Sequence, residues 1–252
     1  MLGYLLQTKK RINHEIFKTY NLSIAFALTS FSAIATPGLG VITITTDDPV
    51  KYMKWITNAV PVFKEAWGEN VGAFGICSPS SGAQKMGEHF IWSVSPSLSV
   101  GYASSNDVFL HEPSVREINK IARSRTVERR DTYGIIKNTV RVYGEGETTA
   151  QYNLLSTPEN VKTYIKAIGA LEAEAAENGF DDIEMAVFEA SGAGDRAGKV
   201  IASVQAPNLS RLGAFMDQRW SSWMADASQE FPTLRVAEHE WIQTCTTLYS
   251  SN

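Results

Sequence analysis

The stretch Ser93–Gly101, SVSPSLSVG, decides how this chain is organised, because it returns as Ser203–Gly213, SVQAPNLSRLG. The shared pattern is Ser-Val, then Pro followed by Ser or Asn, Leu and Ser, and finally Gly; Pro96 to Pro207 is a shift of 111 residues and Gly101 to Gly213 one of 112. A second pair of segments, Tyr52–Ile56 and Tyr164–Ile168, repeats at a shift of 112. The same shift in separate segments indicates duplication of a whole structural unit.

The composition is that of a folded, soluble protein. The chain has 252 residues, of which 44% are hydrophobic and 20% charged, and a formal net charge of -4. No basic patch indicates a nucleic-acid partner. Two cysteines, Cys77 and Cys245, fit neither a disulfide-rich scaffold nor a zinc site. We expect each to be a small buried residue on a strand, with a single disulfide between them as the alternative.

Residues 1–35 have the features of an export signal. Lys9-Lys10-Arg11 supplies positive charge, residues 20–35 are apolar and rich in small side chains, and Ala33-Ile34-Ala35 matches an A-x-A cleavage pattern. An uncleaved membrane anchor is the alternative, but a span needs about 20 predominantly apolar residues and this run is shorter. Cleavage after Ala35 would leave a mature chain of net charge -7. We therefore expect an exported protein, periplasmic or secreted, without a stable membrane anchor.

Six elements are expected in residues 41–141. Alternating and helical apolar spacing, with the capping pair Asp48-Pro49, separates strands from helices. The expected order is strand Val41–Thr45, a helix from Pro49 to Trp67, strands Val71–Cys77 and Glu88–Ser95, a helix over Pro113–Arg123 and strand Thr126–Ile136.

Residues 150–249 repeat this order after a linker at 142–148. Thr157-Pro158-Glu159 is expected to open the first helix and Asn178-Gly179 to end it. The glycine-rich stretch 191–198 lies between two strands, which indicates a hairpin loop and not a phosphate-binding loop. The expected order is strand Gln151–Leu155, the helix, strands Ile183–Glu189 and Lys199–Gln205, a helix over Leu212–Ala227 and strand Leu234–Thr246.

Each unit is therefore β-α-β-β-α-β, the ferredoxin-like plan of the α+β class. Such a sheet has helices on one face and needs a partner for the other, which two copies in one chain can give each other. Over residues 41–249 this order and duplication resemble a tandem dimeric α+β barrel. That group includes antibiotic-biosynthesis-type monooxygenases, NIPSNAP-like and EthD-like proteins, and the haem-binding chlorite dismutases. We recognise no motif of a particular member family.

The last expected strand carries the candidate site. Strict alternation places Arg235, His239, Trp241 and Gln243 on one face, and Asn153 alternates in the same way on its own strand. If that face lies between the two sheets, its polar groups need partners, since each unsatisfied group costs roughly 1–3 kcal/mol. We therefore expect a ligand pocket there. The alternative is a face of mixed exposure along an uncovered sheet.

Three classes of function stay open. The resemblance implies a small-molecule-binding protein or a cofactor-independent monooxygenase or isomerase, with a non-catalytic ligand- or partner-binding protein as the alternative. A haem protein would need an axial histidine, which the resemblance to chlorite dismutases implies on a helix of the second unit; residues 212–229 contain none. We therefore expect no cofactor and no metal, with a haem-binding protein like the chlorite dismutases as the alternative. Catalytic residues cannot be assigned, and a homo-oligomer is possible.

Overall fold

The computed structural model describes residues 35–141 and 143–251, and those after Ala35 form one compact unit. The expected export signal lies outside the described residues, apart from Ala35. None of the helices in the described part of the chain has the length and apolar character needed to cross a membrane.

The first half of the unit matches the expected order with one helix added. Asp48 caps the first helix by accepting a hydrogen bond from the Lys51 N–H, and Pro49 occupies its first turn. The added helix begins after Ser97 and was not expected, because Ser, Gly and Asn interrupt its apolar residues. The elements are β1 Gly38–Thr45, α1 Pro49–Trp67, β2 Ala73–Ser81, β3 Glu88–Ser95, α2 Leu98–Leu110, α3 Glu112–Ile121 and β4 Thr126–Lys137.

The second half differs from the expectation at two helix boundaries. Thr157 and Pro158 pair with the last strand, so its first helix begins later, capped by Asn160. The expected helix over Leu212–Ala227 is interrupted by a 3-10 turn, after which Ser221 caps a new helix. The elements are β5 Thr148–Pro158, α4 Val161–Glu177, β6 Glu184–Gly192, β7 Val200–Ala206, α5 Leu209–Met216, α6 Ser222–Ser228, α7 Phe231–Leu234 and β8 Arg235–Ser250.

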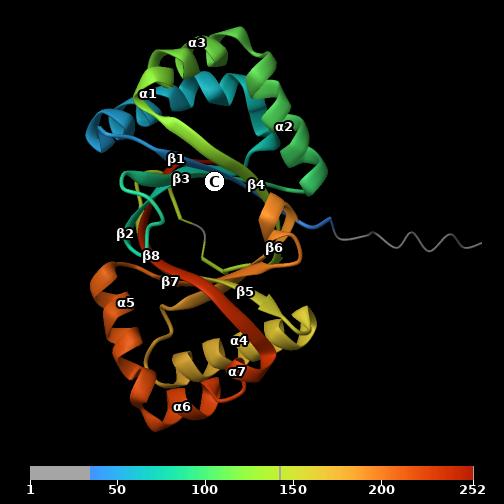
Figure 1. The fold of residues 1–252 in the computed structure, drawn as a ribbon, viewed down its shortest axis with the longest axis vertical. Coiled ribbons are helices and arrows are strands. Elements are labelled where there is room, and N and C mark those ends of the chain that lie inside the picture. Colours follow the sequence, from blue (N-terminus) through green and yellow to red (C-terminus); the bar gives the residue numbers. More distant parts are fainter. Residues whose placement is uncertain (1–34, 142, 252) are drawn as a thin grey trace, which may run out of the picture. The chain divides into compact units, whose positions relative to one another are not determined.

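The eight strands form a closed barrel in the order β1-β3-β2-β8-β5-β7-β6-β4. The four strands of each half are neighbours, and the halves meet where β2 pairs with β8 and where β4 pairs with β6. Helices α1 to α3 cover the barrel beside β1 and β3, and α4 to α7 cover the opposite side (Figure 1). The structure is thus of the α+β class, and its closed sheet leaves no unpaired edge.

Three groups of buried side chains follow from this arrangement. One lies between the first-half strands and α1 to α3, and a second between the second-half strands and α4 to α7. The third lies inside the barrel and consists of Tyr133, Leu155, Ala193, Ile201 and Trp241.

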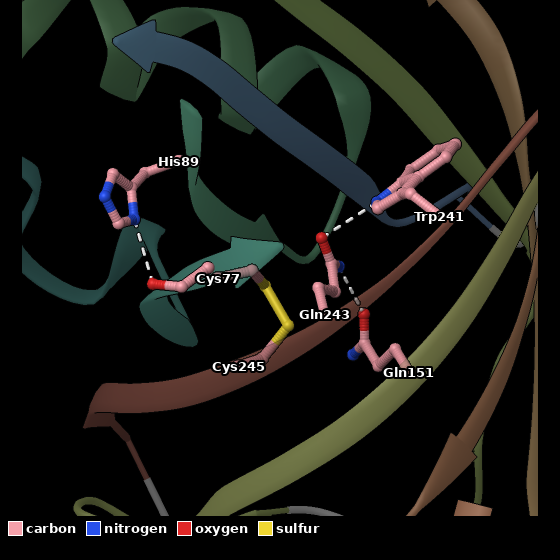
Figure 2. Close-up of a disulfide and its surroundings, with 7 residues drawn as sticks. Cys77, His89, Gln151, Trp241, Gln243 and Cys245 are labelled. Carbon is pink, nitrogen blue, oxygen red and sulfur yellow. Dashed lines mark hydrogen bonds between the residues drawn. A yellow bond between two sulfur atoms is a disulfide. The ribbon is translucent and has the colours of Figure 1, made fainter. Parts of the chain in front are cut away.

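A disulfide joins the two halves. Cys77 on β2 and Cys245 on β8 lie directly opposite each other, and both are buried (Figure 2). Their burial on strands confirms the expectation, and their pairing is the alternative that the sequence left open. The bond links residues 168 positions apart.

Candidate functional site

Three of the predicted pocket residues line a cavity of about 260 Å³ inside the barrel, named here the barrel cavity. Trp241 and Gln243 on β8 and Asn153 on β5 are all buried and belong to its wall. The structure places these three side chains inside the barrel, and their binding of a ligand stays a prediction.

Strand register arranges the polar side chains of the barrel cavity in two rows. Gln151 lies opposite both Gln243 and Gln205 in the ladders of β5. Two residues further along β5, Asn153 lies opposite both Trp241 and Ser203. Strands β8, β5 and β7 consequently carry a polar patch, named here the amide wall, all of whose members except the fully buried Ser203 line the cavity: Gln151, Asn153, Ser203, Gln205, Trp241 and Gln243.

Hydrogen bonds satisfy only part of the amide wall. Trp241 Nε1 donates to Gln243 Oε1 at 2.9 Å, and Gln243 Nε2 donates to Gln151 Oε1 at 2.8 Å (Figure 2). Asn153 Nδ2 and Ser203 Oγ are buried without a hydrogen-bond partner among the described residues. The amide wall therefore contains polar groups that still need a hydrogen-bond partner.

The neighbouring end of the barrel interior holds a charged network. Arg196, in the hairpin between β6 and β7, donates to Tyr133 Oη at 2.9 Å and lies 3.7 Å from the Asp131 carboxylate. Arg129 pairs with the same carboxylate at 2.7 Å. Burial raises the pKa of Asp131, against the effect of the two guanidinium groups. The sequence indicated a hairpin loop here but not that its arginine folds back into the barrel.

Arg235 does not share a face with His239 and Trp241, and that prediction is wrong. The register of β5 and β8 shifts between Leu155, opposite His239, and Ser156, opposite Ala237. This bulge reverses the alternation, because it adds one residue to β8. Arg235 consequently faces α4 and donates to Tyr164 Oη at 2.7 Å.

His239 lies beside the barrel cavity without belonging to its lining. Its ring is half-buried and stacks on Trp241, with the ring centroids 5.5 Å apart. Its contact is thus with a wall residue and not with the empty volume.

A second cavity, of about 180 Å³, lies between the first-half strands and α1 to α3 and is named here the helix-side cavity. Small residues on β1 and β3, including Gly40 and Ser93, form its floor, and aromatic side chains such as Tyr52 and Trp55 form its walls. The sequence prediction did not include this cavity.

The two halves differ at the floor of the helix-side cavity. Gly40 lies opposite Ser93 in the first half, whereas the positions shifted by 112 and 111 residues are Tyr152 and Val204, which lie opposite each other in the second. Tyr152 and Val204 pack against the second-half core. The first half is therefore hollow where the second half carries a phenol ring.

The charge beside this position is also reversed. Arg130 lies opposite Ile42 on β1, and Glu240 lies opposite Leu154 in the equivalent ladder. Tyr152 Oη donates to the Glu240 carboxylate at 2.7 Å. The second-half position is thus filled by a neutral phenol ring that is hydrogen-bonded to an acid. Within the described chain, the ion pairs of the neighbouring charges involve Arg129 and Asp131 but not Arg130. The guanidinium of Arg130 instead lies over the Phe109 ring, 4.7 Å from its centroid.

An arginine–tyrosine hydrogen bond is common to both halves, which indicates a structural role. Arg125 donates to Tyr52 Oη at 3.0 Å, as Arg235 does to Tyr164. Both tyrosines are fully buried, and burial raises the pKa of Tyr52 despite the nearby Arg125. These pairs hold the start of β4 and of β8 against the helices, so Arg125 is a wall of the helix-side cavity with an existing partner.

The two cavities do not fit haem. Histidine, methionine and cysteine thiolate are absent from the described lining of both, and the cavity-lining Cys77 and Cys245 are joined in a disulfide. The remaining type of ligand, tyrosine, is represented by Tyr52 and Tyr102 in one cavity and by Tyr133 and Tyr143 in the other. The hydroxyl groups of Tyr52 and Tyr133 are bonded to arginines and that of Tyr102 to the Ser191 carbonyl, and burial raises the pKa of Tyr52, Tyr133 and Tyr143. Iron coordination favours the opposite, an ionised phenol.

Comparison with known proteins supports the fold and no particular family. No protein-family model and no curated protein matches the chain. A solved structure described as a "putative monooxygenase" from Fusobacterium nucleatum is 11% identical, with a TM-score of 0.54, and the match covers 86% of this chain and 95% of that one. A structure described as a "putative chlorite dismutase" is 11% identical, with a TM-score of 0.55 over 84% of this chain and 95% of that one.

A chlorite dismutase from Candidatus Nitrospira defluvii is 12% identical, with a TM-score of 0.51 over 85% of this chain and 92% of that one. These three neighbours share the overall fold of this chain. Likeness at this level of identity shows a shared fold, and a fold hosts many chemistries.

Proposed function

We propose that the protein binds a small aromatic acid in the helix-side cavity. The observation that carries this proposal is the difference between the halves: Tyr152 and Glu240 fill the second half, while Gly40 and Arg130 leave an open position beside a cation in the first. A planar ring would occupy the space that the phenol takes in the other half. A carboxylate on that ring would pair with Arg130. At the equivalent place in the second half, Glu240 instead accepts a hydrogen bond from the Tyr152 hydroxyl.

The position of the cation supports an anionic ligand, because Arg130 is exposed and lines the helix-side cavity. Desolvation lowers the pKa of Arg130, and the positive charge of Arg125 lowers it further. A carboxylate brought to this position would offset that desolvation and accept hydrogen bonds from the guanidinium. The aromatic walls would supply the apolar contact that small-molecule sites share.

Binding of 1-naphthoate by the purified protein, measured by calorimetry, tests the proposal. Arg130→Gln should weaken binding at least tenfold, whereas Arg123→Gln, a change on an exposed arginine outside the lining, should leave it unchanged. Ser93→Val, which copies the residue of the filled half, should also weaken it. Equal affinity for 1-naphthoate and neutral naphthalene would contradict the role of Arg130.

The monooxygenase- or isomerase-like activity that the family resemblance suggests stays a prediction for this cavity. We also propose that the halves are two duplicated ferredoxin-like units, 41–141 and 150–249. The support is that shifts of 112 residues for β1 and 111 for β3 carry the Gly40–Ser93 pair of the first ladder onto the Tyr152–Val204 pair of the second. Self-association of the protein likewise stays a prediction.

We propose export with cleavage after Ala35. The disulfide between Cys77 and Cys245 supports this proposal, because structural disulfides persist mainly in oxidising compartments. N-terminal sequencing of the natively expressed protein should begin at Thr36 or within a few residues. An intact Met1 in a membrane fraction would instead indicate an anchor.

A further inference from the structure

The barrel cavity has two chemically different walls. Its polar side is the amide wall of β8, β5 and β7. In the closed barrel, β1 lies four strands away from β5, and β3 lies four strands away from β7, so these strands form the opposite side. Their contribution to the lining is apolar: Leu39, Val41, Phe90, Trp92 and Val94.

The amide wall presents donors and acceptors side by side. Gln205 is 9% exposed and lies opposite Gln151, whose oxygen already accepts from Gln243. The N–H groups of Gln151 and both ends of the Gln205 amide take part in no hydrogen bond between described residues. Asn153, 3% exposed, adds an amide nitrogen without a partner. A ligand meeting this wall would therefore need a donor and an acceptor on adjacent atoms of one edge.

We propose that the barrel cavity is a second ligand site, distinct from the helix-side cavity, and that it binds a neutral planar heteroaromatic compound with a lactam or imide edge. Such an edge places an N–H beside a C=O and can pair with the amides of Gln151, Asn153 and Gln205. The flat face of the ring would lie against the aromatic and branched side chains of β1 and β3. The charged groups at the end of the barrel interior pair with one another: Arg129 and Arg196 both lie beside the Asp131 carboxylate. These two arginines therefore do not favour an anionic ligand.

The cavity also extends to the surface. Its lining includes Thr139, Arg141 and Tyr143, from the segment that links β4 to β5, and Arg141 is exposed. This segment is the side on which a small molecule would enter under this proposal.

The probe for this site is 4-quinazolinone, a neutral bicyclic lactam, with naphthalene as the matched ring without the polar edge. Calorimetric titration of the purified protein should give saturable binding of 4-quinazolinone, at least tenfold tighter than that of naphthalene. Gln205→Leu and Asn153→Leu should each weaken 4-quinazolinone binding at least tenfold and leave naphthalene binding within threefold.

Two variants separate this site from the helix-side cavity. Arg130→Gln and Ser93→Val should keep the affinity for 4-quinazolinone while they weaken binding of 1-naphthoate. Circular dichroism and thermal melts should show that all four variants are folded. Absence of saturable 4-quinazolinone binding, or binding that Gln205→Leu leaves unchanged in a folded protein, would overturn the proposal.

Discussion

Asn153 lies opposite Ser203 in the ladder between β5 and β7, and each carries a buried polar atom that hydrogen-bonds to no described residue. A fold selected for stability alone would place apolar side chains at both positions, because an unsatisfied buried group costs free energy and contributes nothing in return. In these two residues, the polar groups that could bind a ligand are therefore the same groups that lower the stability of the unliganded protein.

Asn153→Leu should stabilise the unliganded protein. Leu has nearly the same shape as Asn and removes the unsatisfied amide, so the free energy of unfolding should rise by roughly 1–3 kcal/mol. Urea denaturation measures this change. Gln151→Leu is the matched control: it removes the acceptor of the Gln243 amide and should lower the free energy of unfolding. Equal destabilisation by both changes would contradict the argument.

Removal of the disulfide should destabilise the protein strongly. Replacing Cys77 and Cys245 together by Ser releases a constraint across 168 residues and should lower the free energy of unfolding by about 2–4 kcal/mol. Urea denaturation with and without reductant measures the effect. Reductant should shift the midpoint of the wild-type protein and leave that of the double variant in place; a wild-type midpoint that reductant does not move would refute this.

His89 should make the protein sensitive to acid. Burial lowers its pKa below 6.5 in the folded state, so the unfolded state takes up a proton first as the pH falls. Its contribution to stability is thus fully present above pH 6.5 and is lost as the pH falls through the folded pKa. Its ring meets Ser78, at 2.9 Å, and stacks beside Tyr52, and neither contact supplies a counter-charge.

His89→Gln should flatten the loss of stability below about pH 6.5, since glutamine does not titrate and can still hydrogen-bond to Ser78. Urea midpoints at several pH values, compared with the wild-type protein, measure the slope. An unchanged slope in the variant would assign the acid sensitivity to another group.

Residues 150–252 expressed alone should self-associate. The inner face of their strands carries Ile201 and Trp241, which pack with first-half residues inside the barrel, and Trp241 lies 6.0 Å from Phe90 between ring centroids. Without the first half this face would be an exposed patch with apolar residues. Size-exclusion chromatography with light scattering measures the outcome, and a stable, soluble monomer would show that the second half does not need the first.

Much of the fold was predictable because apolar spacing separates strands from helices and caps mark most helices; burial itself alternates regularly along β8 from Trp241 onward. The 112-residue shift from Tyr52 to Tyr164 identified the two halves, and alternation placed Trp241 and Gln243 inside the barrel. Helix α2 escaped prediction because it has no continuous apolar stripe. Arg235 was misplaced because the bulge in β8 depends on pairing with β5, which a single strand's sequence does not reveal.

The candidate sites were predictable only in part. The helix-side cavity results from Gly40 lying opposite Ser93, and a gap between two small residues is visible only once the register is known. Arg196 reaches the barrel interior from a glycine-rich hairpin whose sequence indicates a surface turn. Pairing of the cysteines required the position of β2 beside β8, which closure of the barrel determines.

The pairing of β2 with β8 also sets a timetable for biosynthesis. Cys77 leaves the ribosome 168 residues before Cys245, which at roughly 5–20 residues per second is a wait on the order of ten to thirty seconds. During that interval β2 has only β3 as a neighbour in the native order, and its thiol has no native partner. The nascent first half must therefore be protected from premature oxidation and from pairing with other chains until the final strand arrives.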